Sequence, residues 1–235
     1  GYLAAMSGPL KPLRIAMCDT TFDGAPVDPA CQTAVQNTAH LLADLGHHVT
    51  PSRPRADHKG MMHAWTRIVA CGTALGIRQA VAAQGRSLRA GDIQGVSASA
   101  VAFADTISGA DYLAAVGVIH KYGREMAHAF ADFDILLCPT MAEPPAKIGR
   151  FTHERDDYED YRTGPGGVFE YSPFCASFNA SGQPAATLPL HWTEGGLPVG
   201  VQLAAAFGND EMLIALCAQI EWAQPWANKR ASFRV

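Results

Sequence analysis

The sequence has few charges and no cluster of one sign. Of its 235 residues 17% are charged, the formal net charge is −4, and the lysines and arginines are scattered along the chain. Proteins that bind nucleic acids or anionic membrane surfaces carry concentrated basic patches. The sequence therefore predicts neither nucleic acid nor a membrane as a partner.

Long apolar runs and paired cysteines are also absent. No run reaches the roughly 18 residues that a membrane-spanning helix needs. Residues 1–10 lack the charged start and apolar core of a signal peptide. The six cysteines are scattered and form no C-x-x-C pair, which is typical of reduced thiols in a cytosolic protein. We therefore expect a cytoplasmic location.

Several common catalytic and cofactor motifs are missing. The chain has no G-x-S-x-G elbow, no G-x-G-x-x-G turn, no Walker A loop and no H-E-x-x-H zinc motif. His58 and His63 come nearest to a metal pair, but their spacing of five places them on different faces of a helix. We interpret them as solvated or capping histidines. The sequence predicts no metal and no cofactor.

Apolar residues make up 48% of the chain, enough to bury a sizeable core. Short apolar runs predict strands, and stripes at helical spacing predict helices. The continuously apolar run Phe133–Cys138 is expected to be an interior strand, covered on both faces. The predicted strands are 13–18, 47–50, 133–138, 185–190 and 199–205, and the predicted helices are 28–46, 59–84, 97–107, 111–130 and 211–223.

The order of these elements predicts the fold class. Strand, helix and strand with short links at the start of the chain indicate a parallel β-α-β unit. His47 should compensate the end of that first helix and lead into the strand. Residues 154–167 are charged and glycine-rich without a period, so we expect an exposed loop or lid there. We predict an α/β fold with a mixed central β-sheet covered by helices, forming a single domain over residues 1–235.

The stretch 173–208 has the strongest pattern in the chain. It reads PFCASFNASGQPAATLPL, a polar turn, and then GLPVGVQLAAAFG. We interpret its first residues as an aromatic and polar loop. Two apolar runs joined by a glycine turn predict neighbouring strands. Pro189 in the first run cannot donate a hydrogen bond, so one side of that strand should be unpaired.

These strings resemble the C-terminal end of the amidase signature family. The family pattern there is roughly PFN-x-[ST]-G-x-P-[AS]-x-x-[LV]-P followed by G-[LM]-P-[IV]-G-[VL]-Q, and FDILLCPT at 133–140 is similar to another family strand. The strings are most similar to 6-aminohexanoate-cyclic-dimer hydrolases and general bacterial amidases. The resemblance covers nearly the whole chain but only the C-terminal half of the family. It implies a small-molecule amide substrate and a homo-oligomer.

The catalytic motif of that family is not in this sequence. Family members use a lysine, a serine on a cis peptide and a nucleophilic serine in a run such as GGSSGG. Here the glycine run Gly164–Gly167 contains no serine, no two serines are adjacent, and none of the five lysines lies in such a motif. We therefore expect the C-terminal portion of an amidase, with no catalytic residue of its own and a triad in a missing N-terminal half.

Five residues are candidates for substrate binding. Tyr171, Phe174, Phe178 and Asn179 lie in a segment punctuated by glycine and proline, where aromatic rings and one amide could hold a small apolar amide. Cys71 lies on a helical stripe and could face a pocket. In the alternative interpretation the two phenylalanines cover the sheet, Asn179 bonds the turn backbone, and Cys71 is a buried structural thiol.

Two other functions compete with the amidase portion. One is a non-catalytic subunit or scaffold of the amidase fold that acts with partners, and the other is an unrelated α/β domain that binds small molecules. If half of the fold is absent, apolar surface and a strand edge are exposed, and the chain should self-associate or be marginal in stability. The helix at 97–107 and the strand at 13–18 are the expected contact surfaces.

Overall fold

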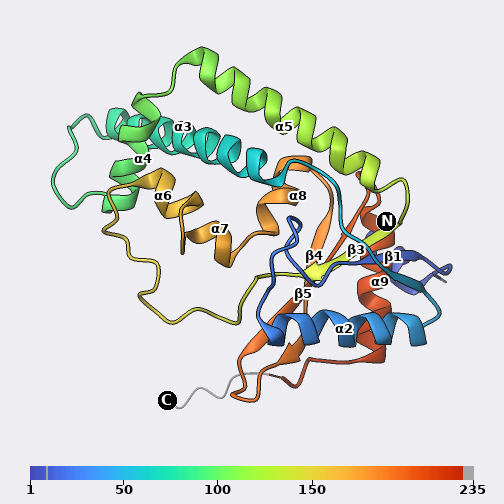
Figure 1. Cartoon of the computed structure of the whole chain (residues 1–235). Coiled ribbons are helices and arrows are strands. Elements are labelled where there is room, and N and C mark those ends of the chain that lie inside the picture. Colours follow the sequence, from blue (N-terminus) through green and yellow to red (C-terminus); the bar gives the residue numbers. More distant parts are fainter. Residues whose placement is uncertain (9, 230–235) are drawn as a thin grey trace. The chain divides into compact units, whose positions relative to one another are not determined.

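The computed structural model describes residues 1–8 and 10–229, and their contacts form two compact units. The sheet unit comprises Gly1–Arg55, Met126–Pro145 and Gly182–Val235. The helical unit comprises Ala56–Glu125 and Ala146–Ser181. Figure 1 shows the elements of both units, coloured along the chain. The single domain expected from the sequence stays a prediction, and each unit is considered by itself.

The sheet unit contains one mixed sheet, as predicted. β1 is parallel to both of its neighbours, β2 and β3. β5 runs antiparallel to β3 and to β4. The α/β fold class with a mixed central sheet is therefore confirmed. The strand order is β2-β1-β3-β5-β4, with bounds β1 Arg14–Met17, β2 His48–Pro51, β3 Ile135–Pro139, β4 Ala185–Trp192 and β5 Pro198–Ala205.

The interior strand is where the sequence placed it. All five residues of β3 are buried, and the strand lies between β1 and β5. β4 and β5 are neighbours, and within the described residues β4 pairs with β5 alone, as predicted. The structure adds a register shift between Leu188 and His191, which falls at Pro189. The expectation that the first strand is an association surface is wrong, because β1 is hydrogen-bonded to a strand on each side.

Three helices belong to the sheet unit: α1 Tyr2–Ser7, α2 Pro29–Asp44 and α9 Asp210–Ala223. The Asp28 carboxylate accepts from the Ala30 N–H and caps α2, and Gly46 follows that helix at φ 92°, a conformation that glycine adopts without strain. α2 contacts β3, β4 and β5, whereas α9 contacts β4, β5 and α1 (Figure 1). The predicted parallel β-α-β unit is confirmed.

His47 lies between the end of α2 and β2, as expected, but its ring makes buried contacts that the sequence did not indicate. The ring is 5% exposed, so it lies in the core. Its Nδ1 accepts from the Leu13 N–H at 3.1 Å, and its Nε2 lies 2.8 Å from Gln219 Oε1 on α9. Because Nδ1 accepts, Nε2 carries the proton and donates to Gln219. The ring therefore links the entry of β1 to α9.

The helical unit is built around α3. The long predicted helices are present, each shifted by one or two residues, and α5 continues beyond Glu125 into the sheet unit. Gly85 ends α3 at φ 61°, as the sequence indicated. α3 contacts α4, α6 and α8. The helices are α3 His58–Gln84, α4 Gly95–Asp105, α5 Gly109–Ala129, α6 Tyr158–Thr163, α7 Val168–Tyr171 and α8 Cys175–Ser181.

The start of α3 is tied to α5 by buried polar contacts. His58 is 4% exposed, and its Nδ1 lies 2.9 Å from the Tyr122 hydroxyl. The Asp57 N–H donates to the Glu125 carboxylate at 3.0 Å. The prediction of a solvated or capping histidine is therefore wrong for His58, because a tyrosine of α5 meets it in the interior. His63 is half-exposed, 3.6 Å from the Glu159 carboxylate.

The segment 154–167 is more ordered than its composition suggested. It contains α6, whose first residue, Tyr158, is 7% exposed and packs in a cluster with Ala70 and Ala100. The Asp157 carboxylate caps α6 by accepting from the Asp160 N–H. The prediction of an exposed loop is wrong for the middle of this segment, because one aromatic residue anchors it to α3 and α4.

In the part of the chain that the structure describes, no single helix has both the length and the apolar composition that a membrane span requires. The bent pair Gly95–Asp105 and Gly109–Ala129, with 106° between them, passes by length and composition only.

Candidate functional site

The five candidate residues all belong to the helical unit. Cys71 lies on α3, Tyr171 is the last residue of α7, and Phe174 precedes α8. Phe178 and Asn179 lie on α8, which contacts α3. The aromatic segment predicted as a loop is therefore partly a helix. Its buried residues at 174, 177 and 178 recur at helical spacing, and the Ser181-Gly182 turn follows, with Gly182 at φ 75°.

The burial of the candidates differs widely. Phe174 is 0% and Phe178 is 4% exposed, so both rings lie in the interior. Cys71 and Tyr171 are half-buried, and Asn179 is exposed. A fully buried ring gives a ligand little free surface, so Cys71, Tyr171 and Asn179 are the accessible members of the set. The substrate-binding role of all five stays a prediction.

Tyr171 contacts the segment of the helical unit that begins at Ala146. Its hydroxyl oxygen accepts from the Ala146 N–H at 3.1 Å. Its ring centre lies 5.4 Å from that of Phe151, and the Arg150 guanidinium lies 5.5 Å from it. A phenol that accepts one hydrogen bond still has its own proton to donate. Tyr171 can therefore position this segment and also donate to a carbonyl group.

The sequence reasoning missed Arg162, which fastens α6 and α7 to α3. Its Nε donates to Thr66 Oγ1 on α3 at 3.3 Å. Its guanidinium lies 4.7 Å from the ring centre of Phe169 and 5.5 Å from that of Tyr158. Arginine binds aromatic faces favourably because of the ring quadrupole. The only sequence signal was an arginine spaced four residues after one aromatic and seven before another.

Ser177 on α8 was also missed. It is 0% exposed, and within the described residues its Oγ has no hydrogen-bond partner. A buried hydroxyl without a partner costs about 1–3 kcal/mol. Nothing in the sequence distinguished this serine from Ser181, four residues later.

Four of the cysteines are not suited to nucleophilic catalysis. Burial raises the pKa of Cys31 to about 12 and that of Cys217 to about 11. Burial also raises the pKa of Cys18 and of Cys175. A catalytic thiol needs a lowered pKa so that the thiolate forms near neutral pH. These four thiols therefore stay protonated.

The lysines do not form a catalytic base either. A lysine that serves as a general base is usually buried, because desolvation favours the neutral amine. All five are exposed: Lys11, Lys59, Lys121, Lys147 and Lys229. Metal chemistry has no support from the side chains, since the described part of the chain has no cluster of three histidine, cysteine or acidic residues placed to hold an ion.

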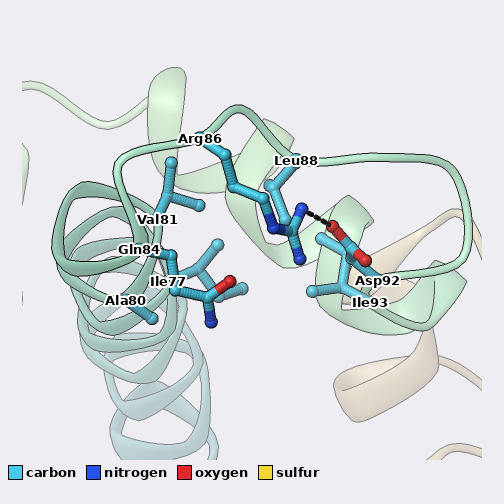
Figure 2. Close-up of a pocket in the computed structure, with 8 residues that line it drawn as sticks. All are labelled: Ile77, Ala80, Val81, Gln84, Arg86, Leu88, Asp92 and Ile93. Carbon is cyan, nitrogen blue, oxygen red and sulfur yellow. Dashed lines mark hydrogen bonds and ion pairs between the residues drawn. The ribbon is translucent and has the colours of Figure 1, made fainter.

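A pocket of about 170 Å³ lies at the end of α3 (Figure 2). The Arg86 Nη1 and Asp92 Oδ2 atoms are 2.6 Å apart and form one wall. None of the five candidate residues lines this pocket, so it is separate from the predicted site. Its lining residues are Ile77, Ala80, Val81, Gln84, Arg86, Leu88, Asp92 and Ile93.

Comparison with known protein families shows to which family this chain is related. Residues 2–214 match the family described as Amidase. This chain belongs to the amidase family. The resemblance inferred from the C-terminal strings is therefore confirmed, and it extends over both units.

Comparison with individual amidases supports the same family relationship. The 6-aminohexanoate-cyclic-dimer hydrolase of Paenarthrobacter ureafaciens is 30% identical over 87% of this chain and 42% of its own length. That of Pseudomonas sp. strain NK87 is 31% identical over the same shares. A solved structure of 6-aminohexanoate cyclic dimer hydrolase with substrate has a TM-score of 0.88 and 28% identity, over 97% of this chain and 48% of that one. The chain spans about half the length of these relatives.

Proposed function

We propose that this chain is the C-terminal portion of an amide hydrolase, and that polypeptide outside this chain contributes the Ser–cisSer–Lys triad. The chain matches the amidase family over most of its length. It nevertheless contains no adjacent serines and no glycine run with a serine. The portion described here would contribute core, sheet and substrate contacts rather than the nucleophile.

The exposure of all five lysines is the observation that carries this proposal. In the triad chemistry of the family the lysine accepts a proton through the bridging serine, which requires a desolvated amine. No lysine in this chain has that environment. A hydrolase that uses this mechanism must therefore obtain its base from another segment.

We propose a substrate class from the relatives of this chain. Hydrolases named for the cyclic dimer of 6-aminohexanoate match 87% of this chain, so small aliphatic amides are the first compounds to test. The half-buried Tyr171 and the exposed Asn179 offer hydrogen-bonding groups to an amide. Cys71 on α3 would contribute a small apolar contact.

The test begins with the purified chain alone. It is incubated with 6-aminohexanoate cyclic dimer and with simple aliphatic amides, and the release of amine or ammonia is measured. We expect no turnover above buffer. Turnover that disappears in a single variant, Ser177→Ala or Ser181→Ala, would show a nucleophile in this chain and contradict the proposal.

A second arm separates an amidase portion from a scaffold. The chain is combined with the N-terminal half of the Paenarthrobacter ureafaciens hydrolase, and the intact hydrolase serves as the positive control. Restored turnover supports the amidase portion. A stable complex without turnover favours the alternative, a non-catalytic subunit that acts with partners.

A further inference from the structure

The pocket at the end of α3 has walls that come from one short segment of the helical unit. All of its lining residues lie between 77 and 93, on the last turns of α3 and in the loop that follows the helix (Figure 2). The walls therefore need neither the sheet nor polypeptide outside this chain to form.

Most of the lining is aliphatic. Ile77 and Val81 on α3 and Ile93 in the loop are half-buried, and Leu88 is 44% exposed. A ligand chain that covers these side chains gains the free energy of removing apolar surface from water. The pocket volume of about 170 Å³ is that of about six water molecules in the liquid, so only a short chain fits.

The polar wall of the pocket carries no net charge. The pKa of Asp92 is lowered mainly by its hydrogen bond from Arg86, so both groups are charged at neutral pH and compensate each other. A charged ligand would be attracted by one of them and repelled by the other, and it would lose part of its own hydration. The wall therefore favours a neutral head group.

The same ion pair offers a donor and an acceptor to a ligand. Arg86 uses Nη1 for its bonds to Asp92 Oδ2 and to the Ser87 carbonyl, and in the described part of the chain its Nε and Nη2 make no hydrogen bond. Asp92 Oδ2 also accepts from the Arg89 N–H, whereas Oδ1 accepts from none of the described residues. Figure 2 shows the second terminal nitrogen of Arg86 directed into the pocket. An amide complements this wall, because its carbonyl accepts and its N–H donates.

We propose that this pocket binds a small neutral aliphatic amide, with the alkyl chain on the aliphatic wall and the amide group on Arg86 and Asp92. The choice of an amide among neutral head groups rests on the proposed function, since an amide hydrolase meets such molecules as substrates. None of the five candidate residues lines the pocket. It is therefore a second site for the substrate class, and a bound amide would fasten the loop at 86–93 to the end of α3.

The test is an NMR titration of the methyl-labelled chain with three probes that share one alkyl chain: butanamide, butanoate and butylamine. We expect butanamide to shift the methyl signals of Ile77, Val81 and Ile93 with a dissociation constant of about 1–10 mM. The two charged probes should bind at least about threefold more weakly. Equal or tighter binding of either charged probe, or no shift with butanamide, would overturn the proposal.

Two variants locate the site. Ala80→Leu places a larger side chain in the pocket and should abolish the shifts. Ala83→Leu is the matched control, because Ala83 is an exposed alanine of the same helix that does not line the pocket, and leucine suits a helix at both positions. Ala83→Leu should bind as the wild type does. Unchanged binding in Ala80→Leu would place the amide elsewhere and contradict the proposal.

A further titration follows addition of the N-terminal half of the Paenarthrobacter ureafaciens hydrolase. Retained shifts support a site that stays open beside that polypeptide, whereas their loss would mean that the added half fills the pocket and would overturn the proposal. Because turnover is measured in none of these titrations, a failure here leaves the proposed function in place. Turnover by the chain alone would contradict the proposed function without changing the shifts.

Discussion

The contacts inside the sheet unit differ in kind from the contacts inside the helical unit. In the sheet unit, backbone ladders join strands that are far apart in the sequence, and all five residues of β3 are buried. In the helical unit, single polar contacts connect the helices, such as His58 with Tyr122 and Arg162 with Thr66. The helical unit also has an apolar cluster around Tyr158, so the contrast is tested at single positions: a buried leucine of the sheet and a buried hydroxyl of the helices.

The largest effect is expected at the centre of the sheet. Leu136 is 0% exposed on β3, so Leu136→Ala should lower the free energy of unfolding by about 3 kcal/mol through lost burial and a residual cavity. Urea unfolding measures the change. The control is Leu75→Ala at a side chain that is 57% exposed, which should change stability by less than about 0.5 kcal/mol. Equal effects at the two leucines would contradict the contrast.

Two glycines should respond with opposite signs. A Cβ on Gly200 of β5 would lie 2.8 Å from both Thr140 Oγ1 and Thr187 Cγ2, whereas one on Gly72 of α3 would meet nothing within 4 Å. Gly200→Ala should therefore destabilise by about 2 kcal/mol through overpacking. Gly72→Ala should stabilise by about 0.5–1 kcal/mol, because alanine favours a helix interior. Thermal unfolding of both variants measures the two signs, and stabilisation by Gly200→Ala would contradict the predicted clash.

Loss of the polar contact at the start of α3 should lower stability by a smaller amount. Tyr122→Phe removes the hydroxyl that lies 2.9 Å from His58 Nδ1, and the cost should be about 1 kcal/mol. Tyr112→Phe is the matched control, since that ring is 38% exposed at the start of α5. Native-state hydrogen exchange in α3 should rise in Tyr122→Phe only. Unchanged exchange would mean that apolar packing holds this helix end.

The smallest changes in stability are expected when two carboxylates, those of Asp134 and Glu125, are protonated at low pH. The pKa of Asp134 is lowered mainly by its hydrogen bond from Arg14, and the pKa of Glu125 is lowered mainly by the Asp57 N–H. A lowered folded-state pKa adds stability above the unfolded value of about 4, and this stability is lost as pH falls through the folded value. Because the Arg14 pair is partly exposed, Asp134 should contribute less than about 1 kcal/mol.

Stability measured from pH 7 to pH 2.5 tests this expectation. Asp134→Asn and Glu125→Gln should each be less stable than the wild type at pH 7, and the differences should disappear at the acid end. A difference that persists at low pH would assign the loss to packing rather than to the charged form.

The sequence was informative where apolar runs decide the structure. The run at 133–138 predicted the interior strand, and Pro189 predicted the unpaired side of β4, because burial and a missing N–H act locally. Side-chain partners far along the chain could not be predicted in this way. The buried His58 has its partner, Tyr122, 64 residues away on another helix. The aromatic residues before the last strands were predicted to form a loop, yet Tyr171 ends α7 and Phe178 lies on α8.

The way the chain passes between its units has a consequence for its synthesis. Arg14 bonds Asp134, 120 residues later, and the pairing of β3 with β5 requires residues up to Ala205. A ribosome delivers β1 and β2 before β3, so the edge of β1 that pairs with β3 stays open while the first three helices of the helical unit emerge. Such long-range pairing slows folding and prolongs the exposure of apolar strands. Nascent β1 is therefore the segment of this chain with the longest need of chaperone protection.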